Sequence, residues 1–272
     1  MIEICLSMRY NKLKNSRMKS AAEGEKSMGQ VIAVTSGKGG TGKTTLCAAV
    51  ASCMAAEGLR VLCIDMDMGL RNLDISLGMA ELAPISFADV LTGRYRLEDA
   101  APHPDIPGLF LVTSPMTDSK DRLNVQDFGQ LLQSARESFD YCLIDSPAGI
   151  GSGFRFATCF ADRVILVATP DPAALRDAAY TGDQLEQMGR EQVKLVINRV
   201  KPALFRRLHW TVDDIMDEVG LPLLGLIPND ENVVLAAAAN MPLICRSDRG
   251  AAQACLHIAR RIQGRRVPLL RI

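Results

Sequence analysis

The sequence predicts a doubly wound α/β fold, in which a mostly parallel sheet of seven to eight strands has helices on both faces. First, seven short apolar segments alternate with segments of helical periodicity between residues 29 and 264. Second, 48% of the 272 residues are hydrophobic, so the chain can bury one large core. Third, a glycine-rich loop at residues 37–44 joins the first apolar segment to the first helical segment.

The individual elements can be justified in order along the chain. Residues 31–35 are an apolar, β-branched run typical of a buried strand, and residues 44–57 have the pattern of a helix that Gly58 ends as a C-cap. Apolar residues recur at helical spacing over residues 125–138. Similar patterns predict strands at 60–65, 109–113, 141–145, 164–168, 193–198 and 223–227, and helices at 86–92, 172–188, 231–239 and 250–263.

Several segments do not follow this alternation. Residues 1–28 carry six Lys or Arg against three Glu and have little periodicity, so we expect a disordered, basic extension. Residues 68–108 are mixed, with a proline-rich turn expected at 102–107, and residues 206–210 are expected to form a surface loop. Residues 265–272 make a short basic and aliphatic tail, which leaves 29–264 as a single expected domain.

The overall composition excludes several classes of protein. The formal net charge is zero, so nucleic acid is an unlikely partner for the whole chain. The eight cysteines are scattered without a C-x-x-C pair, which suits small buried side chains in a reducing cytoplasm. No apolar run approaches the roughly 20 residues of a membrane-spanning helix, and the first 28 residues lack the apolar core of a secretory signal.

The glycine-rich segment fits the phosphate-loop pattern G-x-x-x-x-G-K-[ST], and it lies between a strand and a helix as that motif requires. Its glycines allow backbone N–H groups to converge on phosphates, and the helix N-terminus adds partial positive charge. We expect Lys43 to reach the β- and γ-phosphates of ATP and Thr44 to bind Mg²⁺. The expected nucleotide-binding residues of this loop are Gly37, Lys38, Gly39, Gly40, Thr41, Gly42, Lys43, Thr44 and Thr45.

Three acidic residues follow predicted strands, at the edge of the sheet where α/β proteins bind ligands. Asp145 ends the apolar run Tyr-Cys-Leu-Ile, which is the Walker B pattern, and is expected to support Mg²⁺ through bound water. Asp65 and Asp67 are two residues apart on one extended segment, so both can face the same side. We expect Asp67 to orient the attacking water and Asp65 to support Mg²⁺ indirectly. The alternative is that these carboxylates only cap loops or turns.

Lys38 is an additional lysine at the start of the loop. An ordinary phosphate loop needs only Lys43, and a second lysine at this position cannot easily reach the same γ-phosphate. Lys38 resembles the signature lysine of deviant Walker A ATPases, which crosses a dimer interface to the partner's nucleotide and stabilises charge during phosphoryl transfer. The alternative is a solvated loop lysine.

Six motifs together resemble the MinD branch of this ATPase family. They are Gly37–Thr45, Asp65–Asp74, Thr113–Asp121, Asp145–Ile150, Arg176–Asp177 and Gly225–Asp230. The similarity spans about residues 30–265, and Gly69–Asp74 discriminates best because ParA relatives usually differ there. The resemblance implies that Asn198, Pro228 and Asp230 contact adenine.

The resemblance further implies a cycle of ATP binding, face-to-face homodimerisation, membrane association and partner-stimulated hydrolysis. MinC- and MinE-like regulators would be the partners, in the cytoplasm and peripherally on the inner face of the cell membrane. Relatives usually end in an amphipathic membrane helix, whereas this chain ends at 265–272 with Pro268, which disfavours a helix. We therefore expect the tail to cover the core, with at most a weak contact with anionic lipid.

Other functions share parts of this pattern. A ParA-type partitioning or flagellar-placement ATPase would have the same loop, and the cluster at 260–271 is the one candidate for a DNA-binding patch. An ATP-dependent adaptor that binds ATP but hardly hydrolyses it would have the same switch residues. Iron–sulfur carrier ATPases carry paired cysteines, whereas Cys245 and Cys255 are ten residues apart. Related tyrosine kinases need a tyrosine-rich tail, and this chain ends without any tyrosine. The three histidines are isolated, so no metal beyond Mg²⁺ is expected.

Overall fold

The computed structural model describes residues 28–67, 71–82, 84–115 and 125–270. The extension expected at residues 1–28 lies outside these ranges, apart from Met28. None of the helices in the described ranges is long and apolar enough to cross a bilayer.

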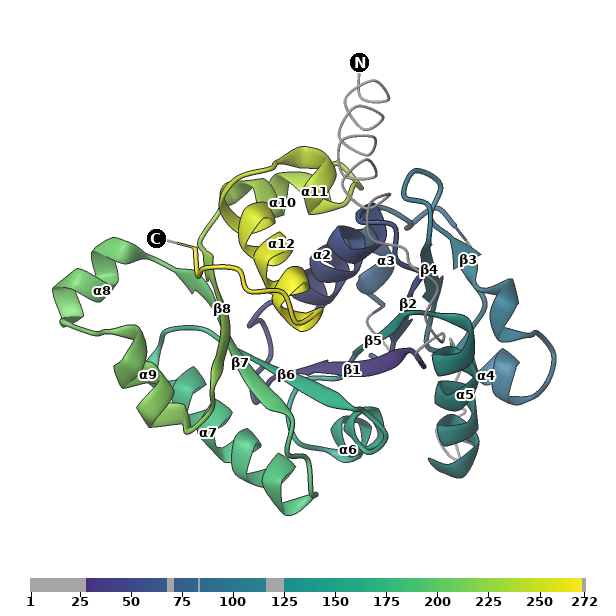
Figure 1. The fold of residues 1–272 in the computed structure, drawn as a ribbon, viewed down its shortest axis with the longest axis horizontal. Helices are drawn as coiled ribbons and strands as arrows, with labels where there is room; N and C mark the ends of the chain where they lie inside the picture. The colour runs from purple at the N-terminus through teal and green to yellow at the C-terminus, as the bar shows by residue number, and fades with distance from the viewer. Residues whose placement is uncertain (1–27, 68–70, 83, 116–124, 271–272) are drawn as a thin grey trace.

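The core is one eight-stranded sheet in the order β3-β4-β2-β5-β1-β6-β7-β8, which confirms the predicted fold class (Figure 1). Neighbouring strands run parallel except for β3 and β4. The first strand in the sequence lies in the middle of the sheet, so the chain winds outwards in both directions and leaves a ligand crevice beyond its carboxyl end. The strands are β1 (Gln30–Thr35), β2 (Val61–Asp65), β3 (Ala101–Pro102), β4 (Leu109–Val112), β5 (Tyr141–Asp145), β6 (Arg163–Ala168), β7 (Val193–Val200) and β8 (Leu223–Pro228).

Helices cover both faces because every central strand is apolar on both sides. In β1, Ile32 and Val34 pack on one face and Val31 and Ala33 on the other, and all four are buried. The first face carries α2 (Lys43–Ala56), α3 (Leu73–Leu77), α10 (Glu231–Ala238), α11 (Leu243–Arg246) and α12 (Gly250–Ile262). The second carries α4 (Phe87–Leu91), the 3₁₀ turn η1 (Leu97–Asp99), α5 (Val125–Ser138), α6 (Ser152–Thr158), α7 (Pro172–Gln187) and α9 (Val212–Val219).

The structure corrects two of the segments to which a conformation had been assigned. Ala101–Pro102 pairs antiparallel with β4 as a two-residue edge strand, although a turn was expected to begin at Pro102. Arg206–Leu208 was predicted to be loop but forms the last turn of α8 (Pro202–Leu208), which ends at His209 in a left-handed conformation. None of the residues of α8 is fully buried, although Phe205 packs against the core.

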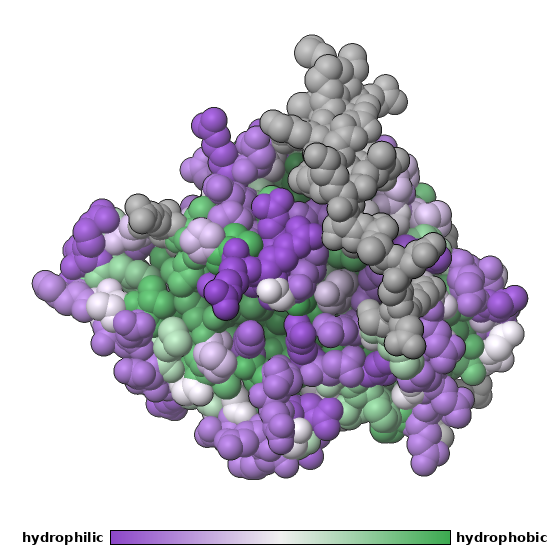
Figure 2. Space-filling model, viewed as in Figure 1, coloured by the Kyte–Doolittle hydropathy of each residue, from purple (hydrophilic) through white to green (hydrophobic). Residues whose placement is uncertain are grey.

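The C-terminal tail folds back onto β8 and α12. The Arg261 Nε donates to the Val267 carbonyl at 3.0 Å, and Leu270 packs against the core. A His257 ring nitrogen lies 3.2 Å from the Pro268 carbonyl. Figure 2 shows that apolar surface remains over β7 and β8 on this side, framed by hydrophilic side chains of the surrounding helices.

Candidate functional site

The loop between β1 and α2 has a backbone that its glycines make possible. Gly40 and Gly42 have φ angles of 77° and 93°, in the left-handed region that L side chains avoid. A Cβ on Gly42 would lie 2.3 Å from the Asn198 Nδ2, which donates to the Thr41 carbonyl at 2.7 Å. The end of β7 therefore braces the loop from the side, and only glycine fits at position 42.

Two carboxylates meet beside this loop because their strands are neighbours. Asp65 at the end of β2 is in register with Asp145 at the end of β5, and Val34 of β1 pairs with Asp145 from the other side. The Thr44 hydroxyl donates to the Asp145 Oδ2 at 2.6 Å. The other carboxylate oxygen of Asp145, Oδ1, is buried and has no hydrogen-bond partner among the described residues.

The electrostatics of Asp145 match this incomplete bonding. Burial raises the pKa of Asp145 to about 7, against the opposing effects of the Thr44 hydrogen bond and the Lys43 charge. A buried carboxylate with one unused oxygen, next to a hydroxyl, is the donor set that Mg²⁺ accepts directly or through water. Thr44 and Asp145 therefore fit a magnesium ion. No group of three or more metal-binding side chains is found elsewhere in the described part of the chain.

The second acidic pair is Asp65 and Asp67. Strand β2 ends at Asp65, and Asp67 lies two residues beyond it. Asp65 is fully buried, and its two carboxylate oxygens accept the backbone N–H groups of Asp67 at 2.9 Å and Leu73 at 3.2 Å. Burial raises the pKa of Asp65, and these hydrogen bonds oppose the rise. Asp65 thus holds the loop, whereas the Asp67 side chain is partly exposed.

The two loop lysines occupy different environments. Lys43 opens α2 and is 8% exposed, whereas Lys38 is exposed at the start of the loop. Sequence reasoning missed Asp171, whose pKa is lowered by a hydrogen bond from Thr169 and, to a smaller degree, by the charge of Lys38. The Thr169 Oγ1 donates to the Asp171 Oδ2 at 2.6 Å. The sequence signal that could have identified Asp171 is an acidic residue just after a predicted strand, in Thr169-Pro-Asp171.

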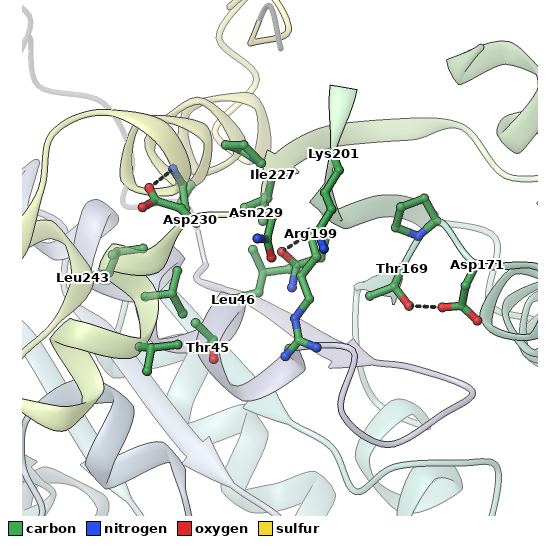
Figure 3. Close-up of a pocket in the computed structure, with 18 of the residues that line it drawn as sticks. Thr45, Leu46, Thr169, Asp171, Arg199, Lys201, Ile227, Asn229, Asp230 and Leu243 are labelled. Atoms are coloured by element: carbon green, nitrogen blue, oxygen red, sulfur yellow. Dashed lines mark hydrogen bonds between the residues drawn. The ribbon is translucent and has the colours of Figure 1, made fainter. Parts of the chain in front are cut away.

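A cavity of about 480 Å³ adjoins the phosphate loop (Figure 3). Asn198, Pro228 and Asp230, which were expected to contact adenine, all line it next to Gly42 and Thr45. The Asp230 carboxylate accepts N–H groups of Asn232 and Ala251 at 2.9 Å, and so joins the N-termini of α10 and α12. Although burial raises the pKa of Asp230, these hydrogen bonds hold it below its ordinary value.

Two cationic lining residues of the cavity were missed in the sequence. Arg199 and Lys201 follow Asn198 at the end of β7, and Figure 3 shows the Arg199 side chain directed into the cavity. Arg199 has a φ angle of 57°, which is uncommon for a residue with a Cβ, and it lies where the register between β7 and β8 shifts. Two cations within four residues of a predicted strand end were the signal.

Comparisons with known proteins identify the family of the chain. Residues 32–243 match the model of the CobQ/CobB/MinD/ParA nucleotide binding domain. The chain is 35% identical to the septum site-determining protein MinD of Synechocystis, over 89% of this chain and 92% of the relative.

Two solved structures extend the comparison to the fold. The MinC:MinD cell division complex of Aquifex aeolicus contains a chain that is 34% identical, with a TM-score of 0.83 over 89% of this chain and 98% of that one. MinD of Pyrococcus horikoshii complexed with Mg-ADP is 27% identical, with a TM-score of 0.75 over 86% and 96%. The chain therefore belongs to the MinD family of septum site-determining proteins, within the CobQ/CobB/MinD/ParA nucleotide-binding domains.

Proposed function

We propose that this protein is a MinD-type ATPase that places the cell-division site, binding Mg²⁺ and ATP, dimerising on ATP and hydrolysing it under the control of a partner. The observation that carries the proposal is the pairing of Thr44 with Asp145 beneath a glycine-rich loop, with one carboxylate oxygen left unused. That arrangement needs a cation and offers backbone N–H groups for phosphates. The Mg-ADP complex of the Pyrococcus horikoshii relative supports the same nucleotide chemistry.

Each residue of the site has a separate task in the proposed mechanism. Thr44 and, through water, Asp145 would hold Mg²⁺, which would supply positive charge against the β- and γ-phosphates. Lys43 contacts the same phosphates from the first turn of α2, where it is pre-positioned by burial. Asp67 orients the attacking water, because its carboxylate is partly exposed while that of Asp65 is engaged with the backbone. The cavity lined by Asn198, Pro228 and Asp230 receives adenine.

Lys38 acts across the interface of an ATP-bound homodimer. Its exposed position at the start of the loop, in contrast to the buried Lys43, supports this assignment. Lys38→Ala should retain nucleotide binding yet lose dimer formation in sedimentation and lose ATP turnover. Lys194→Ala is the matched control, because Lys194 is an exposed lysine near the start of β7, at the opposite edge of the sheet. An intact ATP dimer with normal turnover in Lys38→Ala would refute the assignment.

Asp67 is tested independently of dimerisation. Asp67→Ala should bind ATP and form the dimer but hydrolyse about 10²- to 10⁴-fold more slowly, because a water-orienting group is removed. Single-turnover hydrolysis measured at saturating protein concentration gives the rate. An unchanged rate in the presence of the activating partner would show that another group orients the water.

The partners follow from the family. The Aquifex aeolicus relative was solved as a MinC:MinD complex, and this supports a MinC-like partner here. A MinE-like activator is proposed by resemblance alone. The tail at residues 265–270 packs on the domain, so we expect weak, ATP-dependent binding to anionic liposomes at most. Flotation with ADP and ATP, with a variant ending at Gly264 as control, measures it.

A further inference from the structure

Two loops far apart in the sequence are joined next to Asp67. Ser114 follows β4 and is fully buried, and its hydroxyl donates to the backbone carbonyl of Asp67 at 3.1 Å across a sequence separation of 47 residues. The carbonyl of Ser114 in turn accepts from the Arg71 Nη2. The two segments belong to the motifs at 65–74 and 113–121, and nothing in the mechanism above uses this connection.

The same peptide is held from its other side. The N–H of Asp67 donates to the Asp65 Oδ1 at 2.9 Å, so both backbone polar groups of Asp67 are bound by buried side chains. The other Asp65 oxygen holds the N–H of Leu73, where α3 begins. Asp67 therefore projects from a backbone fixed at two points, although it lies outside any helix or strand.

We propose that Ser114 is a positioning residue for hydrolysis, which aims the Asp67 carboxylate by holding the Asp67 carbonyl. This inference rests on the proposed role of Asp67 in orienting water. A side chain that orients a water must be held within about 0.5 Å of its productive position, and a loop residue reaches that precision only through supporting hydrogen bonds. The Asp65 carboxylate anchors the N–H side of this residue, and Ser114 supplies the matching anchor on the carbonyl side.

The physical consequence of losing the hydroxyl is specific. In Ser114→Ala the Asp67 carbonyl loses its donor, while the loop, Lys43 and Thr44 that bind the nucleotide are untouched. We therefore expect kcat to fall about tenfold or more, because small displacements of a catalytic group have large effects on rate. The KM for ATP should stay within about twofold.

The experiment compares five variants, Asp67→Ala included, by steady-state and single-turnover ATP hydrolysis. Ser114→Cys keeps the volume with a weaker donor and should give an intermediate kcat; it carries the test if Ser114→Ala does not fold. Ser134→Ala is the matched control, because this exposed hydroxyl donates only within α5, and it should leave kcat unchanged. Adding Ser114→Ala to Asp67→Ala should slow hydrolysis no further, because Ser114 acts through Asp67.

The outcomes separate this inference from the proposed function. A normal kcat in Ser114→Ala together with an inactive Asp67→Ala overturns the role of Ser114 alone. An equal loss from Ser114→Ala in the wild-type and Asp67→Ala backgrounds also overturns it, because the effect then does not pass through Asp67. A normal rate in Asp67→Ala overturns both. A loss confined to kcat, absent from the Asp67→Ala background, supports the inference.

Discussion

Asp145, where its strand ends, is bonded differently from the acidic residues where the parallel strands begin. At the edge where the parallel strands begin, the Asp140 Oδ2 accepts the Arg60 N–H at 2.7 Å, and the Asp162 Oδ2 accepts the Val31 N–H at 2.7 Å. Where the strands end, Asp145 keeps one buried oxygen without a partner among the described residues, and its pKa rises to about 7 because of burial. The acidic residues at the first edge are bonded by the backbone, whereas Asp145 at the second has one oxygen available to a ligand.

The difference affects the stability of the folded protein. Folded Asp145 holds its proton to a higher pH than the unfolded chain does, so its ionisation at neutral pH opposes folding until a cation binds. The beginning of the sheet is bonded within the protein. There the buried Glu57 carboxylate pairs with Arg260 at 2.8 Å and Arg265 at 3.3 Å, which joins the end of α2 to the end of α12.

The largest effect should come from Gly42→Ala at the ligand edge. A Cβ at this position would have the strained φ of 93° and would meet Asn198, so the loop must move. We expect ATP affinity to fall on the order of 100-fold, about 2.7 kcal/mol, by isothermal titration calorimetry. Gly189→Ala is the control, because Gly189 has a φ of 71° but open space around it. Equal ATP affinities in both variants would show that the contact between the loop and Asn198 is unimportant for binding.

The opposite edge should respond in stability and not in binding. Glu57→Gln leaves Arg260 and Arg265 without their carboxylate, and we expect the free energy of unfolding to fall by about 2 kcal/mol. Urea unfolding measures the loss, and the ATP dissociation constant should stay unchanged. A weakened affinity for ATP with unchanged stability would reverse the assignment of the two edges.

The smallest effect is a pH dependence at His103, near the start of β4. Its Nδ1 accepts the N–H groups of Asp105 and Ile106 at 3.0 Å, so the neutral ring is required. Burial lowers the pKa of His103 below its ordinary value of 6.5, and the hydrogen bond with Leu77 opposes this. Its contribution to stability is therefore complete above about pH 6.5 and is lost as the pH falls through the lower, folded-state pKa.

The His103 effect is measured as the difference in acid sensitivity between the wild type and His103→Gln. Urea unfolding at pH 7.5 and pH 5.5 should show a larger loss in the wild type than in His103→Gln, which cannot titrate. Equal losses in the two proteins would mean that other groups carry the acid sensitivity.

The sheet could be predicted because buried parallel strands appear as uninterrupted apolar runs, such as 31–35 and 141–145. The two-residue strand β3 is too short to show any period, and α8 is a seven-residue helix without a fully buried side chain. The short helices α3, α6 and α11, of five, seven and four residues, were also not predicted.

The candidate site divides in the same way. The loop, Thr44 and Asp145 could be proposed from local motifs, and the structure brings them together. The bonds from Asn198 to Thr41 and from Ser114 to Asp67 span 157 and 47 residues, and short-range spacing contains no information on such contacts. The backbone hydrogen bonds that Asp65 accepts from Asp67 and Leu73 were not predicted, because alternation along a strand says nothing of the chain beyond the strand's end.

The account depends most directly on the ligand edge being built for Mg²⁺ with nucleotide. ATP binding by isothermal titration calorimetry, with Mg²⁺ or with EDTA, should be compared between the wild type and Thr44→Val, which removes the hydroxyl at nearly constant volume. We expect Mg²⁺ to raise the ATP affinity of the wild type at least about tenfold and to have no effect on Thr44→Val. Equal affinities with and without Mg²⁺ in the wild type, or a full magnesium effect in Thr44→Val, would contradict the account.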